Sequence, residues 1–162
     1  MLHRVNRSRG FSLVELVIVI VIIGVIAAIA VPRISRGAKG AADSAMRGDL
    51  AALRNAIDLY AAEHGGDFPK VAKFVEQLTT YTDASGGDNA TKDSTHIFGP
   101  YLKAIPPLPV AGEGTTGGAK GDTDVAAADG AGVGWIYDEA TGEISANTGT
   151  AEDDTETAYS DY

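Results

Sequence analysis

The sequence predicts an α+β protein in which a long N-terminal helix, membrane-spanning in its first half, packs on a small antiparallel β-sheet domain. Three observations carry this prediction. Residues 11–31 form an apolar run that is broken by a single charge. Apolar side chains then recur at helical spacing through residues 50–60. Further on, two short strand-like segments flank a glycine-containing turn at residues 138–142.

The apolar run is long enough to cross a bilayer. Its length of about 21 residues gives a helix of roughly 31 Å, which matches the hydrocarbon core of a membrane. Glu15 lies inside the run, where a carboxylate costs about 2.5–3.5 kcal/mol on insertion scales. No basic side chain lies within the run to pair with it. Cleavage between Gly10 and Phe11 would create an α-amino group shortly before Glu15, and we expect that amine to be its partner.

A short polar leader precedes the predicted cleavage point. Residues 1–10 include three arginines and end in a small glycine, which leaves room for a peptidase. Two other interpretations of this stretch remain open. An ordinary secretory signal peptide would be cut after Ala28-Ile29-Ala30, and a plain transmembrane anchor would not be cut at all. Neither alternative gives Glu15 a role.

The residues around the predicted cut resemble the N-terminal signal of type IV prepilins and type II secretion pseudopilins. That family has a basic leader ending in Gly, then Phe, a small hydroxyl residue, two aliphatics, Glu and a long apolar helix. The same order is found in residues 10–15, Gly-Phe-Ser-Leu-Val-Glu, and Pro32 stands where the family often has proline. The resemblance implies a type IV pilin-like fold, cleavage by prepilin peptidase after Gly10, N-methylation of Phe11, and assembly roles for Glu15 and Pro32.

The helix is expected to continue beyond the membrane segment, from Phe11 to about His64. Residues 11–32 form its transmembrane and assembly half, and residues 33–64 form its amphipathic half. One apolar stripe in the second half comprises Leu50, Leu53, Ile57 and Tyr60. Two glycines follow at positions 65 and 66, which predicts the helix C-cap there.

Residues 65–150 are expected to form a small globular α+β domain. A short amphipathic helix is predicted at 69–81, and a hairpin of two strands is predicted within 134–146. Residues 111–134, rich in Gly, Ala, Thr and Asp, are predicted to form a long loop. The acidic, threonine-rich residues 151–162 are predicted to be a flexible tail.

Two segments of this domain resemble the major pseudopilins of type II secretion more narrowly. Residues 99–103, Gly-Pro-Tyr-Leu-Lys, are similar to a stretch of those proteins, and residues 65–69 resemble their glycine–aromatic–proline sequence after the long helix. The chain departs from their usual Asp-Pro-Trp-Gly type of continuation, since residues 110–112 are Val-Ala-Gly. The resemblance implies a structural subunit of a helical periplasmic filament that supports protein export. A type IV pilin for adhesion, motility or DNA uptake is the alternative.

The composition limits the chemistry. The chain has 162 residues, a net charge of −9 and no cysteine, which argues against binding nucleic acid through its phosphates and excludes thiolate chemistry. No nucleophile-and-base arrangement or phosphate-binding motif is present, so we expect no enzyme. Asp122, Asp124 and Asp129 offer oxygen ligands on a loop, and the resembling pseudopilins hold calcium near their C-terminal strands. Their spacing is not that of an EF-hand. We assign no metal ligands and no cofactor, and leave calcium open.

The resemblance also implies a cellular location. The protein would cross the bacterial inner membrane once, with the globular domain in the periplasm, before it enters a filament. Its partners would be prepilin peptidase, the inner-membrane assembly platform of a secretion or pilus system, and further copies of itself. Basic residues flank the apolar run on both sides, so the charges alone do not orient it. A monomeric exported binding protein is the alternative outside the filament-forming proteins.

Overall fold

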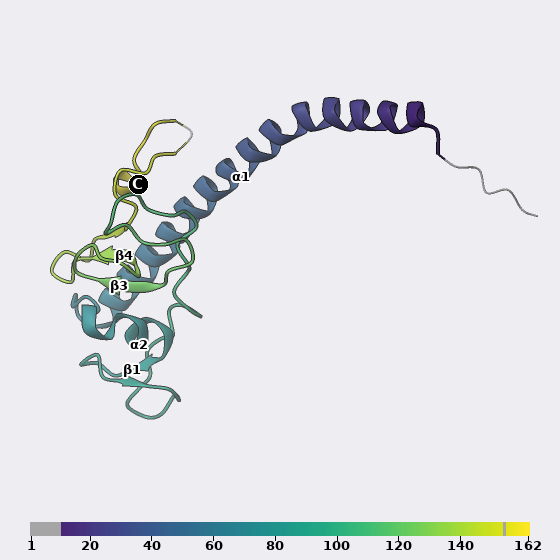
Figure 1. Cartoon of the computed structure of the whole chain (residues 1–162). Coiled ribbons are helices and arrows are strands. Elements are labelled where there is room, and N and C mark those ends of the chain that lie inside the picture. Colours follow the sequence, from purple (N-terminus) through teal and green to yellow (C-terminus); the bar gives the residue numbers. More distant parts are fainter. Residues whose placement is uncertain (1–10, 154) are drawn as a thin grey trace, which may run out of the picture. The chain divides into compact units, whose positions relative to one another are not determined.

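The described chain consists of one long helix, one short α-helix, two short 3₁₀ helices and two small sheets (Figure 1). A computed structural model describes residues 11–153 and 155–162, with only the backbone given for Pro32, Ser35, Arg36 and Ser160. The elements, in chain order, are α1 Leu13–Glu63, the 3₁₀ helix η1 Val71–Lys73, α2 Phe74–Thr79, β1 Tyr81–Thr82, β2 Asp88–Asn89, β3 Asp124–Ala126, β4 Val133–Tyr137, β5 Ile144–Ala146 and the 3₁₀ helix η2 Tyr159–Asp161. The predicted α+β class is confirmed, and the architecture is consistent with a pilin-like fold.

The chain divides into two compact units, residues 1–38 and residues 39–162. Helix α1 belongs to both, and its 51 residues confirm the predicted single long helix. In the first unit the apolar side chains of α1 are exposed on every side. The segment Leu13–Val31 is long and apolar enough to cross a membrane, and none of it is buried within the structure. A helix that is apolar all round requires lipid or other helices around it.

In the second unit, α1 buries one face against the rest of the domain. The predicted stripe is confirmed and is extended toward the N-terminus by Met46; its fully buried members are Met46, Leu50, Leu53, Ile57 and Tyr60. The helix ends where the glycines predict. The N–H of Gly66 donates to the carbonyl of Ala61 at 2.8 Å, and Gly65 has a φ of 71°, which favours glycine.

The larger sheet has the strand order β3-β4-β5. Strands β4 and β5 are antiparallel, with Trp135 opposite Ala146, which confirms the predicted hairpin. Trp135 and Tyr137 are fully buried, whereas Ile136 between them is half-buried. This is the alternation expected of a strand with one face on the core. Strand β3 adds a parallel pair to β4, so the sheet is mixed, while β1 and β2 form a separate antiparallel pair.

Two local expectations need correction. The short helix predicted at 69–81 is divided between η1 and α2, although its apolar residues Phe74 and Leu78 are buried as a helical face requires. The segment 111–134 is not a structureless loop, because it contains β3 and the start of β4. Its glycine content reflects close backbone approach. A Cβ on Gly134, for example, would lie 2.4 Å from the carbonyl oxygen of Asp122.

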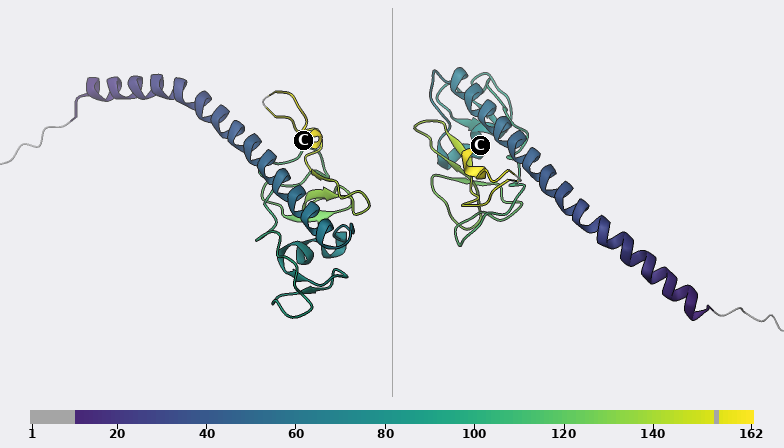
Figure 2. Two further views of the ribbon diagram at one scale, coloured as in Figure 1. Left: turned by 180° about the vertical axis from the view of Figure 1, so that it is seen from behind. Right: turned by 90° about the horizontal axis from the view of Figure 1, so that it is seen from above.

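The segment 151–162 differs from the predicted tail. Tyr159 is 2% exposed, and η2 packs against β5. Figure 2 shows this yellow segment beside the second half of α1. Composition predicts a solvated tail because the segment is acidic, but its two aromatic residues, Tyr159 and Tyr162, supply apolar area to bury. Both belong to the second unit with the part of α1 that they cover.

Candidate processing and assembly site

The helix begins just after the predicted cleavage point. Phe11 and Ser12 are not helical, and α1 starts at Leu13. The N–H of Leu16 donates to the carbonyl of Ser12 at 3.2 Å, which makes Ser12 the N-cap residue. Phe11 is 83% exposed. Gly10, the other half of the predicted cleavage site, lies outside the described residues.

Glu15 has a partner within its own chain. Its carboxylate Oε2 accepts a hydrogen bond of 2.9 Å from the main-chain N–H of Ser12. This contact is one half of a capping box, in which a glutamate in the first turn satisfies the N–H of the N-cap residue. A negative charge at this position also interacts favourably with the helix dipole. The charge that the sequence leaves unpaired is therefore accommodated at the start of the helix.

Sequence analysis missed this contact, although its signal is present. A Ser followed three residues later by Glu, directly before an apolar run, is the sequence signature of a capping box. The amine created by cleavage and the Ser12 N–H are not exclusive partners, because a carboxylate has two oxygens and can accept several hydrogen bonds.

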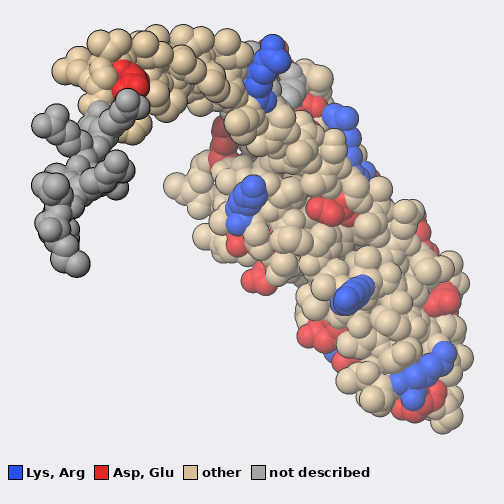
Figure 3. All heavy atoms as spheres, turned by 90° about the vertical axis from the view of Figure 1, so that its right-hand side faces the viewer, with Lys and Arg blue, Asp and Glu red and all other residues tan. Residues whose placement is uncertain are grey.

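The rest of the segment carries almost no charge. Glu15 is the only ionisable side chain between Phe11 and Pro32, and in Figure 3 this part of the molecule is nearly all tan. Acidic and basic side chains are interspersed over the remainder of the face shown. The backbone of Pro32 lies inside α1, so the proline does not end the helix. Its missing N–H still removes one hydrogen bond from the ladder.

One comparison with known proteins gives a match. Residues 5–31 match the family model of the prokaryotic N-terminal methylation motif. The motif indicates a type IV pilin-like protein. Such proteins are processed by prepilin peptidase and assemble into filaments as structural subunits, not enzymes. The apolar part of α1 fits the membrane anchor of a prepilin-like protein. No curated protein and no solved structure matches the chain.

The three aspartates weighed as calcium ligands do not form such a cluster. Within residues 11–153 and 155–162, no group of three or more His, Asp or Glu side chains is arranged to hold a metal ion. Asp122 instead shapes a turn, since its Oδ2 accepts a 2.6 Å hydrogen bond from the N–H of Ala119. Asp124 lies in β3, and Asp129 lies in the connection to β4.

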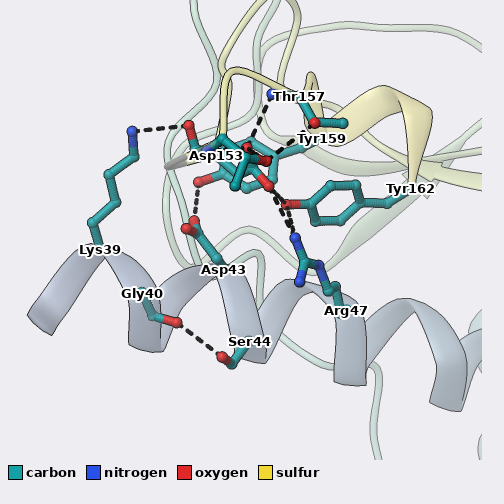
Figure 4. A network of polar contacts seen from close by, with 10 residues as sticks. Lys39, Gly40, Asp43, Ser44, Arg47, Asp153, Thr157, Tyr159 and Tyr162 are labelled. Carbon is teal, nitrogen blue, oxygen red and sulfur yellow. Dashed lines mark hydrogen bonds and ion pairs between the residues drawn. The ribbon is translucent and has the colours of Figure 1, made fainter. Parts of the chain in front are cut away.

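A polar network that the sequence did not reveal joins the C-terminal segment to α1 (Figure 4). Its centre is the buried carboxylate of Asp153, which accepts a 2.9 Å ion-paired hydrogen bond from Arg47 and a further one from the Tyr162 hydroxyl. The hydroxyl of Tyr159 donates to Asp43, one turn before Arg47. The helix and this segment are more than 100 residues apart in the chain, which is why no local pattern predicts their contact.

This network also shifts an ionisation. The pKa of the Asp153 carboxyl lies well below its ordinary value, first because the Tyr162 hydroxyl donates to it and next because the N–H of Thr157 does. Donors that stabilise the charged form of a carboxyl lower its pKa.

Proposed function

We propose that this chain is a structural subunit of a type II secretion pseudopilus. In this proposal, prepilin peptidase cuts between Gly10 and Phe11, and the mature subunit assembles into a helical periplasmic filament that supports protein export. The observation that carries it is Glu15, an acid at the start of an apolar helix within a segment that matches the methylation motif. A capping contact alone would suit any helix, so the support for a filament subunit comes from the acid and the matched motif together.

Processing would take place just outside the helix. Hydrolysis of the Gly10–Phe11 bond consumes one water, leaves a carboxylate on the leader and gives the mature chain a new α-amine at Phe11. Because α1 starts at Leu13, the residue on the mature side of this bond is held by no helical hydrogen bond and is exposed. The N-methylation implied by the motif would keep the amine basic.

Assembly would then bring that amine to the Glu15 carboxylate of a neighbouring subunit. In a helical core of low dielectric constant, opposite charges attract strongly, while either charge alone carries several kcal/mol of desolvation cost. The pair therefore disfavours wrong registers more than it adds net stability. The capping contact with Ser12 supports this step, because it fixes the carboxylate at the helix start before a neighbour arrives.

The positions of two segments in the globular unit support the secretion assignment. The two segments that resemble major pseudopilins, 65–69 and 99–103, both lie at the C-terminal end of α1. Gly66 caps the helix, and the hydroxyl of Tyr101 donates to Glu63 in its last turn at 2.6 Å. The N–H groups of Tyr101 and Leu102 both donate to the carbonyl of Leu78 at 2.9 Å. A type IV pilin remains the second candidate, since it shares the same N-terminal motif.

The variant Glu15→Gln tests the central step. Glutamine can still accept the Ser12 N–H, as glutamine does in capping boxes, but it cannot neutralise an amine. We expect normal cleavage and membrane insertion, with filament yield reduced about tenfold or more because the neighbour's amine is left buried and unpaired. Val19→Leu, one turn further along the same exposed surface, is the control and should assemble normally. Wild-type filament yield from Glu15→Gln would contradict the pairing.

Processing is tested separately by the mature N-terminus. Mass spectrometry of the protein from cells should find a chain that begins with methylated Phe11, and Gly10→Val should leave the full-length precursor. A chain that begins at Val31 would indicate an ordinary signal peptide, and one that begins at Met1 a plain anchor.

Deletion of the gene then separates the two filament types: loss of exported proteins from the medium supports the pseudopilus, and loss of surface pili with normal export supports the pilin.

A further inference from the structure

A buried histidine directly follows the last turn of α1. His64 is 6% exposed, and its ring stacks on that of Tyr60, with centroids 3.8 Å apart and planes 7° from parallel. The ring of Phe98 lies beside it, with the two centroids 5.1 Å apart. These two aromatic neighbours hold the imidazole in one plane, so the directions of its two nitrogens are fixed.

Each ring nitrogen of His64 points at a main-chain carbonyl oxygen. Nδ1 lies 2.8 Å from the oxygen of Tyr60, one turn earlier in the chain, and Nε2 lies 2.9 Å from the oxygen of Asp83. Nε2 is also 3.1 Å from the hydroxyl of Thr82, which can donate or accept. A carbonyl oxygen can only accept. Both carbonyl contacts are therefore hydrogen bonds only when each ring nitrogen carries a hydrogen.

The neutral ring does not meet this condition. A neutral imidazole has one N–H and one bare nitrogen, so either tautomer of His64 places a lone pair against a carbonyl oxygen at hydrogen-bonding distance. Two lone pairs at that distance repel each other. The charged ring has two N–H donors and satisfies both oxygens at once.

The surroundings of the ring favour a positive charge. The last carbonyls of α1 form the negative end of the helix dipole, where a charged histidine is stabilised. The pKa of the Tyr60 hydroxyl is raised first by burial and next by the carboxylates of Asp67 and Asp83. The same negative charges favour a positive ring on His64, which stacks on Tyr60. His96 acts electrostatically on Asp83 as well.

Further ionisable groups lie around the ring. Glu63 accepts a 2.6 Å hydrogen bond from the hydroxyl of Tyr101, whose ring centroid is 6.4 Å from that of His64. Burial first, and this hydrogen bond next, raise the pKa of Tyr101, so its hydroxyl stays neutral. Lys70 is exposed and lies with His64 on a pocket of about 120 Å³. The pocket is large enough for water, which gives protons a path to the ring.

His64 joins the end of α1 to the base of the segment 83–97. The residues on either side of this segment, Thr82 and Phe98, are paired by two main-chain hydrogen bonds of 3.0 and 3.2 Å. We propose that His64 is doubly protonated in the folded subunit and acts as a pH-sensitive fastener of this segment. The segment is attached to α1 while the ring is charged, and its base loosens when the ring loses one proton.

The direction of the pH effect follows from proton linkage. A ring that binds its second proton more tightly in the folded chain than in the unfolded chain stabilises the folded form in acid. Unfolded histidine is half charged at about pH 6.5. The contribution is therefore fully present below that pH, and it is lost as the pH rises through the value at which the folded ring is half charged. The sheet of β3, β4 and β5 should stay folded throughout.

The first experiment reads the protonation of the ring in the full-length chain in detergent micelles. The chain carries histidine labelled with ¹⁵N in the ring, because the ¹⁵N shift distinguishes a protonated from a bare nitrogen. The double variant His3→Gln, His96→Gln leaves His64 as the single histidine and identifies its signals. At pH 7, where unfolded histidine is about one-quarter charged, we expect His64 to be mostly doubly protonated. A ring that is mostly neutral at pH 7 would overturn the proposal.

The second experiment measures the loosening by hydrogen exchange at the amides of Thr82 and Phe98. After correction for intrinsic exchange, their protection in the wild type should fall about tenfold or more between pH 6 and pH 8, relative to the amides of β4. A tenfold change corresponds to one unit of difference in proton affinity. In His64→Gln this fall should be absent, and in the control His96→Gln it should be retained. An equal pH dependence in these two variants would refute the assignment.

A third variant covers the case in which His64→Gln does not fold. His64→Phe keeps a ring against Tyr60 and removes both donors, so its amides at Thr82 and Phe98 should be less protected than those of the wild type at pH 6. That difference should narrow toward pH 8, and a difference independent of pH would contradict the proposal. If neither variant folds, the two wild-type measurements decide. All of them are made on the unassembled subunit, so they remain valid if the filament assignment is wrong.

Discussion

The two parts of α1 bury their apolar side chains in different ways. Before residue 38 the helix leaves them uncovered, and Leu16 is 57% exposed. After residue 39 the same helix carries one covered face, and Leu53 is 0% exposed. The second part is covered by its own chain, including the segment that contains Tyr159 and Asp153. Among the residues that the structure describes, none buries the apolar segment Leu13–Val31 of the first part.

This difference separates folding from assembly along a single helix. The second part forms the core of a domain that is complete in one copy. The apolar segment of the first part needs lipid or other helices around it, and its one charge, Glu15, already has a local partner in the Ser12 N–H. Substitutions in the first part should therefore impair filament assembly, and substitutions in the second part should impair folding of the domain.

The largest difference in unfolding free energy is expected when a leucine is replaced by alanine in each part of α1. Leu53→Ala should destabilise the second unit by about 2–5 kcal/mol, because it leaves a cavity in the core. Leu16→Ala should leave that stability unchanged. Urea unfolding of the full-length chain in detergent, followed by Trp135 fluorescence, measures both. Equal destabilisation by the two variants would mean that the parts of α1 do not act independently.

The next largest effect on stability is expected in the C-terminal segment 151–162, which packs against the second part of α1. Tyr159→Phe keeps the buried ring and removes the hydroxyl that donates to Asp43. We expect a loss of about 1.5–3 kcal/mol, the usual worth of a hydrogen bond to a charged group. Tyr81→Phe, at a half-buried tyrosine of β1, is the matched control and should cost less. If Tyr159→Phe unfolds like the wild type, the segment 151–162 contributes little to the domain.

A smaller, pH-dependent effect is expected at Asp153. A carboxyl whose pKa is lower in the folded chain than in the unfolded chain stabilises the fold fully above its unfolded pKa of about 3.9, and this contribution is lost as the pH falls through the folded value. As the pH falls below about 4, the C-terminal segment of the wild type should therefore become progressively less stable, and the contribution is lost in full only below the folded pKa. Asp153→Asn should be less stable at pH 7, with a difference from the wild type that shrinks as the pH falls.

Local hydrogen exchange tests this directly. The N–H of Thr157 donates to Asp153, so its exchange should accelerate in acid in the wild type and depend less on pH in Asp153→Asn, beyond the intrinsic chemistry of exchange. Asp93→Asn is the control. The pKa of Asp93 is also lowered, first by the N–H of His96, but that carboxyl lies on a different loop. An Asp93→Asn chain that alters Thr157 exchange as strongly would contradict a local role for Asp153.

The sequence pattern predicted those elements that depend on residues close together in the chain. The buried stripe of α1, its glycine C-cap and the hairpin of β4 and β5 all follow from residues close together in sequence. The docked C-terminal segment did not, because Arg47 and Asp153 are joined across 106 positions and neither has a distinctive neighbour pattern. The contact of His64 with the carbonyl of Asp83 escaped prediction for the same reason, since the two are 19 residues apart.

The candidate site shows a different limit. Glu15 and Phe11 are recognised from sequence because an acid is rare in an apolar run and because the flanking order is specific. The contact with Ser12 spans only three residues, but its partner is a main-chain N–H, so the distribution of charged side chains does not indicate it. A polar group in an apolar helix should be compared with the capping pattern before a distant partner is sought.

The smallest effect on folding is expected at an exposed leucine in the second part of α1. Leu59 lies in the second part of α1 yet is 52% exposed, unlike Leu53 on the same helix. Leu59→Ala should change the unfolding free energy by no more than about 0.5 kcal/mol, as is usual for surface positions. Filament yield, measured in the same strain, then shows whether this side chain is covered by a neighbouring subunit. A large loss of stability in the isolated subunit would show that the exposed face of α1 is not free, and the division between folding and assembly would have to be moved along the helix.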